Sequence, residues 1–409
     1  MKISVKNLAD IYKADDIELK DFNVLIGKNG TGKTYFSKLI YFLNSSKYKE
    51  KIFEKLFVSK LIKSFRNKEN IIFNIDEQKK FISEYNNSIK NSFPEFIGSK
   101  KEFFKDFNFD YEINDKLEDI NILYDEAIDD IKAYISLNGF KFIEKLFGII
   151  DSHYLPAARA NYMITYKYLF ESQFNNFREL FLNKSSKKRI SIFPEVENNF
   201  LKDIYQVDTN KHGELYSFGS KIEKQIFKSG KLSIRNPKSQ DLPSYEYKIN
   251  NLKKTIDLIV ASSSVTELSP LIMYFRHKIL NVKNEMLIID EPELSLHPDA
   301  QSILVSILVE AVNLGLKIIL VTHSPYIIEA LNNHLQRDKI KDFELTKSIK
   351  DFEFISSDKV SAYLFEDNTI IDIVDKDEKL IDDKLLNSFN TINEIYDTMR
   401  DIEWDNEND

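Results

Sequence analysis

The chain contains three short, largely apolar runs, each of which is followed by polar residues. They are "FNVLI", "MLII" and "LKIILV", at residues 22–26, 286–289 and 316–321. Runs of this length predict buried strands of a parallel sheet. Because ligands bind beyond the carboxyl ends of such strands, the polar residues after each run are the first candidates for a functional site.

The first run is followed by "GKNGTGKT" and then by a helical pattern of apolar residues. The chain has only ten glycines, yet three fall within this short segment. It fits the phosphate-loop pattern G-x-x-x-x-G-K-[ST] between a strand and a helix, which an ordinary glycine turn would not require. Backbone N–H groups would surround the phosphates of ATP, Lys33 would reach the terminal phosphates, and Thr34 would bind Mg²⁺. The predicted nucleotide-binding residues are Gly27, Asn29, Gly30, Thr31, Gly32, Lys33 and Thr34.

Two adjacent acids end the second run, in "MLIIDEPELSLHP". Neighbouring residues of a strand point in different directions, so the two carboxylates can take different tasks. With a phosphate loop upstream, we predict that Asp290 binds the metal together with Thr34 and that Glu291 polarises the attacking water. The alternative is a charged strand end that faces solvent.

His323 ends the third run, where a side chain could contact a terminal phosphate; the alternative is an ordinary surface histidine. Upstream, Ser262, Ser263 and Ser264 precede a helical pattern of apolar residues. Serines at a helix start normally cap it, but the same geometry presents hydroxyl and N–H groups to a phosphate. The residues alone leave both interpretations open.

In this order the motifs resemble a known family. "GKNGTGKT", "VASSSVTELSP", "MLIIDEPELSLHP" and "VTHSPYIIEAL" are similar to the Walker A, signature, Walker B and switch-histidine motifs of ABC-type ATPases. The resemblance is to the SMC, RecF and OLD-like branch, and within it to stand-alone AAA-family ATPases of bacterial anti-phage systems such as Septu, Gabija and PARIS. "YLPAARA" and "IEKQIFKSGKLSI" also resemble segments of this branch.

The resemblance implies a head-to-tail homodimer, or a higher assembly, with two ATP molecules at its interface. Each ATP, with Mg²⁺, would contact the Walker residues of one protomer and Ser262 to Ser264 of the other. Glu291 and His323 map onto catalytic positions. Ser264 stands where the family has a glycine that permits close approach to the γ-phosphate.

The family's Q-loop glutamine has no clear counterpart in this chain. Two candidates are Gln78, at the polar end of "IIFNIDEQ", and Arg159 in "LPAARA". Neither assignment follows from the residues themselves.

The fold class expected is α/β, a P-loop NTPase of the ABC-type ATPase-head kind, with a helical insertion and a small mixed α/β lobe. The helical insertion rests on Phe53, Phe57, Leu61 and Phe65, which step by four. The lobe, at about 165–255, rests on alternating apolar residues between Gly, Ser and Pro turns. We expect the first ATPase segment at 1–44, the insertion at 45–145 and the second ATPase segment at 146–345. A C-terminal region of strands, helix and acidic tail is expected at 346–409.

The composition limits where the protein can act and which partners it can have. The absence of cysteine excludes disulfides and thiolate sites. No apolar run approaches the roughly 20 residues of a membrane span, and the start lacks a signal-peptide pattern, so we expect a cytoplasmic protein without a membrane partner. The net charge of −8 argues against a broadly basic surface for nucleic acid. Two local basic segments, Lys47 to Lys68 and Lys184 to Arg189, leave DNA as a candidate partner, with a solvated helix face or loop as the alternative.

The acidic residues near the C-terminus invite a second metal site. Asp372, Asp375 and Asp377 lie after the predicted turn at Asp367 and Asn368, where a solvated acidic hairpin is the better interpretation. No nuclease motif is recognised. We therefore predict an ATP-hydrolysing ABC-type ATPase that dimerises through nucleotide and controls a separate nuclease or toxin in anti-phage defence. The alternatives are a DNA-binding repair ATPase like RecF and a transporter subunit, which the large insertions disfavour.

Overall fold

The computed structural model describes most of the chain between Lys2 and Asp382. The described residues are 2–44, 62–63, 66–112, 120–125, 130–134, 151–182, 193–235, 242–252, 254–277, 279–280, 282, 285–340, 353–375 and 377–382. The described strands are β1 (Lys2–Leu8), β2 (Ile11–Glu18), β3 (Phe22–Gly27), β4 (Ile71–Phe73), β5 (Asn108–Glu112), β6 (Ile120–Asp125), β7 (Asp130–Tyr134), β8 (Asp151–Leu155), β9 (Gly230–Arg235), β10 (Ser244–Ile249), β11 (Lys254–Asp257), β12 (Glu285–Asp290), β13 (Lys317–Thr322), β14 (Val360–Glu366) and β15 (Thr369–Asp372). The described α-helices are α1 (Lys33–Asn44), α4 (Ile75–Phe96), α6 (Arg159–Leu182), α7 (Glu195–Tyr205), α8 (Tyr216–Ile222), α9 (Ser263–Arg276), α10 (Pro298–Asn313) and α11 (Pro325–Ile340).

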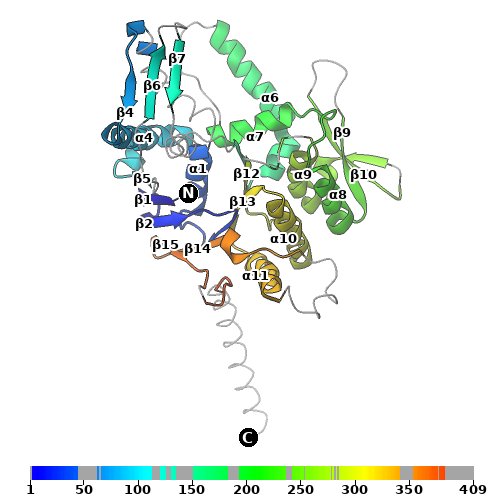
Figure 1. Ribbon diagram of the computed structural model, residues 1–409. Helices are drawn as coiled ribbons and strands as arrows, with labels where there is room; N and C mark the ends of the chain where they lie inside the picture. Colours follow the sequence, from blue (N-terminus) through cyan, green and yellow to red (C-terminus); the bar gives the residue numbers. More distant parts are fainter. Residues whose placement is uncertain are drawn as a thin grey trace.

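A mixed sheet forms the centre of the described structure (Figure 1), with the strand order β5-β1-β2-β15-β14-β3-β13-β12-β8. Strands β14, β3, β13, β12 and β8 run parallel to one another. Antiparallel pairs extend the sheet, since β15 pairs with β14, and β1 pairs with both β2 and β5. The α/β class expected from the three apolar runs is confirmed.

The three predicted strands are β3, β12 and β13, and they lie in the middle of the sheet. Every residue of β3 and β12 is buried, as are all but the first residue of β13. Successive side chains of a strand point to opposite faces, and both faces are covered here. Burial on both faces explains why these strands read as continuous apolar runs.

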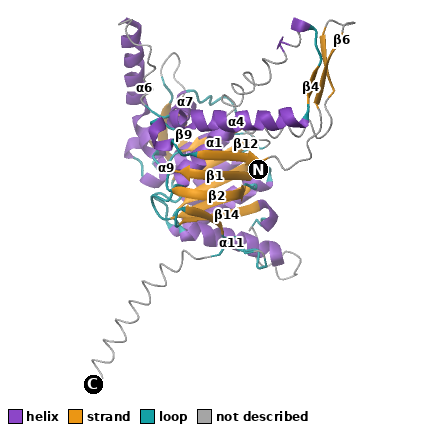
Figure 2. Ribbon diagram, turned by 90° about the vertical axis from the view of Figure 1, so that its left-hand side faces the viewer, coloured by secondary structure: helices purple, strands orange, loops and turns teal. Residues whose placement is uncertain are grey.

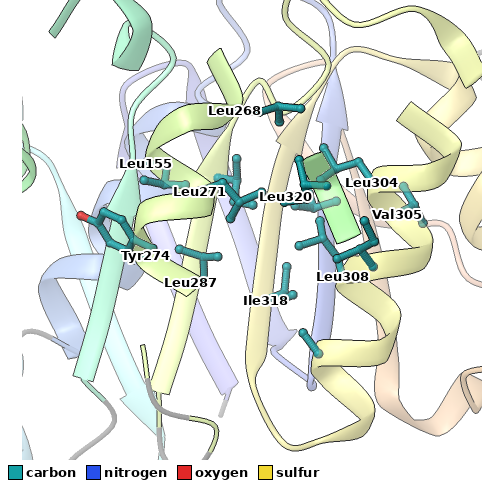
Figure 3. Close-up of a cluster of buried hydrophobic side chains, with 14 of the residues drawn as sticks. Leu155, Leu268, Leu271, Tyr274, Leu287, Leu304, Val305, Leu308, Ile318 and Leu320 are labelled. Atoms are coloured by element: carbon teal, nitrogen blue, oxygen red, sulfur yellow. The ribbon is translucent and has the colours of Figure 1, made fainter. Parts of the chain in front are cut away.

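Helices cover the two faces of the sheet and form two cores. On one face, side chains of α9 and α10 pack on β12 and β13, among them Leu271, Leu304, Leu308, Leu287 and Ile318 (Figure 3). On the other face, α1 packs on β3 and β13, with α4 beside it. Figure 2 shows α4 running along one side of the sheet and α11 on another. This two-sided packing holds the strand ends of the parallel sheet in fixed positions.

The insertion differs from its helical expectation. Within 45–145 the structure has the long helix α4, but also strands β4, β5, β6 and β7. The segment expected as a helical insertion is therefore helical only in part. The segment "NFDYE" of β5 is short, and its pairing partner β1 lies about a hundred residues away, so local periodicity gives it little signal. The four-residue steps from Phe53 to Phe65 lie outside the described residues.

Two further sheets lie outside the central one. Strands β9, β10 and β11 form an antiparallel sheet within the expected small lobe, where α8 packs on α9. Strands β4, β6 and β7 form a second three-stranded sheet. Figure 1 shows the two sheets on opposite sides of the central sheet.

The predicted turn at Asp367 and Asn368 is confirmed. These residues join β14 to β15 and have φ values of 48° and 61°, as in the tight turns that connect antiparallel strands. Beyond it, one carboxylate oxygen of Asp375 accepts hydrogen bonds from the backbone N–H groups of Asp377 and Glu378, so this acid stabilises a turn. The predicted C-terminal helix and acidic tail lie outside the described residues.

Most of the basic segment from Lys47 to Lys68 also lies outside the described residues, as does the one from Lys184 to Arg189. Among the described helices, none is long and apolar enough to cross a membrane.

A buried histidine joins α10 to α11 in the core. The imidazole of His334 is fully buried, with Nε2 3.0 Å from Ser306 Oγ and Nδ1 2.5 Å from the carbonyl oxygen of Glu353. Burial lowers the pKa of His334. The folded protein therefore keeps this ring neutral at a pH where an unfolded chain protonates it.

This difference predicts a pH-dependent stability. The folded-state pKa lies below the ordinary value of about 6.5, so the stability contributed by neutral His334 is lost as pH falls below that value, by at most about 1.4 kcal/mol per pH unit. Urea unfolding of the wild type and of His334→Gln at pH 7 and pH 5 should give a smaller loss of stability for the variant. The matched control is His212→Gln, at the surface, which should retain the wild-type dependence. Equal pH dependence in the wild type and His334→Gln would contradict the prediction.

Candidate functional site

Three strand ends meet at one edge of the sheet. In the parallel register, Asp290 of β12 pairs with Val321 of β13, and Thr322 pairs with Ile26 of β3. The segments that follow these strands therefore leave the sheet side by side. The predicted phosphate loop, Walker B acids and switch histidine are brought together in this way, although they lie far apart in the sequence.

The phosphate loop turns tightly between β3 and α1. Lys33 folds back into the loop, where its Nζ donates to the carbonyl oxygens of Gly27 and Lys28 at 2.8 and 2.6 Å. Thr31 Oγ1 also donates to the Lys28 carbonyl, and Asn29 and Gly30 are exposed. An ammonium held by main-chain carbonyls can exchange them for phosphate oxygens when an anion enters the loop.

Two of the glycines in the loop have clear conformational reasons. A Cβ atom at Gly27 would lie 2.4 Å from the carbonyl oxygen of Phe365, so no other residue fits beside β14. Gly32 has φ +93°, and a Cβ there would meet the side chain of Ile11 at 2.9 Å. The loop thus needs glycine both for backbone conformation and for close packing against the sheet.

The charges of the site lie close to one another. Burial lowers the pKa of Lys33 to about 8, while the nearby carboxylates of Asp290, Glu291 and Glu293 oppose this shift. Burial raises the pKa of Asp290 to about 6. In both residues, burial disfavours the charged form of the side chain. A bound ion of opposite sign would favour the charged form and so reverse the shift in pKa.

Asp290 is held by a residue that the sequence analysis did not identify. The hydroxyl of Tyr154, at the end of β8, donates to Asp290 Oδ2 at 3.0 Å and lies 3.0 Å from Ser37 Oγ of α1. Burial raises the pKa of Tyr154, which keeps its hydroxyl protonated as a donor. Within the described residues, no protein donor occupies Oδ1 of Asp290. This oxygen and the exposed hydroxyl of Thr34 are hard oxygen ligands that fit Mg²⁺, which typically takes few protein ligands besides phosphates.

Glu291 leaves the strand in an unusual conformation. Its φ is +52°, in the left-handed region that non-glycine residues rarely adopt. Its N–H donates to the carbonyl of Val321, and its own carbonyl accepts from Arg159 Nη2 at 2.9 Å. The backbone therefore turns at Glu291, directly after β12 ends at Asp290.

His323 lies beside the phosphate loop. Its backbone N–H donates to Glu293 Oε1 at 2.7 Å, and its ring interacts with the backbone of Gly27. Burial and the charge of Lys33 lower the pKa of His323. A neutral imidazole is thus placed next to the loop, with Glu293 orienting the backbone that carries it. Glu293 belongs to the motif "DEPELSLHP", but its partner His323 follows another strand, β13, so this contact could not be read from the sequence.

The serine cluster begins α9 and is exposed at Ser262 and Ser263. Ser262 occupies the N-cap position without a side-chain capping bond, and its hydroxyl lies 3.2 Å from that of Ser264. In the part of the chain that the structure describes, no hydrogen bond or ion pair joins these serines to the phosphate loop. The hydroxyl groups are available to a ligand or to another chain.

The two Q-loop candidates lie in different places. Gln78 is buried in the first turns of α4. Arg159, the first residue of α6, contacts the site: its guanidinium donates to the carbonyls of Asp290 and Glu291. The segment "YLPAARA" was thus the sequence signal for two residues of the site, Tyr154 and Arg159. The Q-loop assignment itself stays a prediction.

Comparison with known proteins shows to which family the chain is similar. The model of a family described as the AAA ATPase domain matches residues 1–328. No curated protein matches.

Two solved structures are similar at low identity. One is an Smc head bound to the C-terminal winged-helix domain of ScpA, with 12% identity and a TM-score of 0.40, covering 91% of this chain and 96% of the other. The second is an Smc head with an extended coiled coil, bound to the C-terminal domain of ScpA, from Pyrococcus furiosus. It has 12% identity and a TM-score of 0.38, covering 97% of this chain and 98% of the other.

The family match spans most of the chain and includes the phosphate loop, Asp290, Glu291 and His323. It confirms the prediction of an AAA-family ATPase that the order of these motifs suggested. The chain belongs to the AAA ATPase domain family.

Proposed function

We propose that this protein hydrolyses ATP to ADP and phosphate, dimerises through the bound nucleotide, and uses its ATP state to control a partner effector. The observation that carries the proposal is the strand register, which brings Lys33, Asp290, Glu291 and His323 to one edge of the sheet. The shifted pKa values of Lys33 and His323 support it, because each has neighbouring charges of the site among its causes. These are the groups needed to bind phosphates, to hold a metal and to activate water.

In the proposed reaction, Lys33 leaves the carbonyls of Gly27 and Lys28 and binds the terminal phosphates, while backbone N–H groups of the loop surround them. Thr34 and Asp290 would hold Mg²⁺, which neutralises charge on the phosphates when it is bound. Glu291 accepts a proton from the attacking water. The neutral ring of His323 hydrogen-bonds the γ-phosphate.

The homodimer is proposed because the hydroxyls at the start of α9 are exposed and unused for capping. In a head-to-tail dimer, Ser262, Ser263 and Ser264 would reach the γ-phosphate held by the other protomer. We propose a separate nuclease or toxin as the effector and anti-phage defence as the setting, from the motif resemblance.

The first test concerns binding. Lys33→Ala removes one of the few full positive charges in the loop, so ATP affinity should fall by roughly 10- to 100-fold. Isothermal calorimetry measures this directly. Lys6→Ala, an exposed lysine of β1, is the control and should bind as the wild type does. Equal affinity in Lys33→Ala and the wild type would reject the loop as the phosphate site.

The second test separates chemistry from binding. Glu291→Gln retains size but removes the basic oxygen, so turnover should fall by about 10²- to 10⁴-fold while ATP still binds. With ATP retained, the variant should accumulate as a nucleotide-bound dimer in sedimentation. Phosphate release at the wild-type rate would defeat the catalytic assignment. A dead enzyme that keeps its nucleotide-free assembly size would instead count against the dimer.

Asp290→Asn provides the contrast for Glu291→Gln. It removes a metal-binding carboxylate oxygen, so affinity for ATP in the presence of Mg²⁺ should fall at least about tenfold, with little change when Mg²⁺ is chelated. An Asp290→Asn variant with wild-type Mg²⁺ dependence would contradict the role of this residue.

The third test concerns the setting. Bacteria that carry the gene with its neighbouring genes should plate phage less efficiently than cells without them, and Lys33→Ala should restore plating by at least tenfold if ATP binding controls the effector. The Lys6→Ala control should protect as the wild type does. Equal protection by Lys33→Ala and the wild type would exclude control of the effector by nucleotide.

A further inference from the structure

Arg159 is among the most deeply buried charged residues of the described chain. Its side chain is 2% exposed, although it bears a full positive charge. Such a charge is stable in the interior only when it is paired and hydrogen-bonded. The partners that it has therefore indicate what it holds in place.

The guanidinium of Arg159 binds main-chain oxygens from two elements of the site. Nη1 donates to the carbonyl of Asp290 at 2.6 Å, and Nη2 donates to that of Glu291 at 2.9 Å. Nε donates to the carbonyl of Glu267 in α9 at 3.0 Å and lies 3.3 Å from the Glu267 carboxylate. One planar fork thus ties the end of β12 to α9.

The carbonyl of Glu267 belongs to a helix that contains a proline. Pro270 lies within α9, lacks an N–H group, and cannot continue the regular ladder of helix bonds. The missing N–H leaves the carbonyl of Thr266, four residues earlier, without its regular helix donor. The carbonyl of Glu267, to which Arg159 donates, lies in the same turn of the helix.

The same fork holds Glu291 in its left-handed conformation. The residue has φ +52°, and its peptide groups are fixed on both sides, by Val321 before it and Arg159 after it. The direction of the Glu291 side chain follows from this backbone conformation. The contacts of Arg159 are to protein oxygens, including a longer one to the carbonyl of Pro156 at 3.3 Å, and they occupy all three nitrogens of the guanidinium.

We propose that Arg159 is a positioning residue that sets the backbone of Glu291 and couples it to α9, the helix whose first turn carries Ser262, Ser263 and Ser264. In the proposed homodimer, a second copy of this chain that contacts this turn and shifts α9 would, through Arg159, change the direction of the catalytic carboxylate. This inference rests on the proposed role of Glu291. It means that contact at the start of α9 regulates hydrolysis through Arg159.

Arg159→Lys tests this coupling, because a lysine ammonium retains the charge but lacks the planar fork. In the nucleotide-free protein, hydrogen–deuterium exchange should rise in peptides that contain residues 290–296 and 262–268. Turnover should fall by about 10- to 100-fold, as expected for a misplaced reacting group, while affinity for ATP stays within about threefold. A structural defect alone would not separate turnover from affinity in this way.

Arg276→Lys is the matched control. Arg276, in α9, is like Arg159 a buried arginine that pairs with a glutamate. Its partner is Glu223, on the side of α9 that faces the lobe containing α8. The Arg276→Lys variant should lower the melting temperature without changing turnover or exchange at 290–296. Turnover within threefold of the wild type in Arg159→Lys, or exchange that rises uniformly over the protein, would overturn the proposal.

Glu267→Gln decides the question if Arg159→Lys does not fold. It removes the carboxylate partner of Arg159 and keeps the main-chain carbonyl, so turnover should fall by about 3- to 10-fold at unchanged ATP affinity. Unchanged turnover would overturn the coupling to α9. If the wild type itself hydrolyses no ATP, the proposed function fails, whereas exchange at 290–296 still decides whether the fork holds this segment.

Discussion

The parallel pairing of β3, β13 and β12 is the constraint on which the rest of the structure depends. Pairing in this register places the phosphate loop, His323 and Asp290 at one edge. A shift of one residue would turn each strand over and move its buried residues from one core to the other. The two cores on opposite faces of the sheet therefore determine the geometry of the site as well as the stability of the fold.

Three charged side chains of the site are buried in a core that is otherwise largely apolar. Lys33, Asp290 and Arg159 each lose hydration there, and the pKa of each is shifted in the direction that burial dictates. Their compensation comes from main-chain carbonyls and from the hydroxyl of Tyr154. Main-chain oxygens thus make most of the contacts to Lys33 and Arg159, and the Ser37–Tyr154 pair supplies the contact to Asp290.

Helix α9 occupies a central place between the site and the lobe. Its middle packs on the sheet through residues such as Leu271, its N-terminal half contacts Arg159, and Arg276 near its end pairs with Glu223. A movement of the lobe would therefore be transmitted to the helix that carries the serine cluster. The lobe also contacts α10, where Lys221 of α8 pairs with Glu310, so α9 shares this connection with a second helix.

The sequence by itself determined the motifs and the strands that carry them, because glycine spacing and continuous apolar runs are local signals. The loop from Gly27 to Thr34, the acids at Asp290 and Glu291 and the turn at Asp367 were predicted in this way. Strand β5, the donor Tyr154 and the partners of Arg159 were decided by the tertiary structure. Each depends on a contact between segments about a hundred or more residues apart, and a hydrogen bond to a main-chain carbonyl leaves no trace in the identity of the residue that provides it.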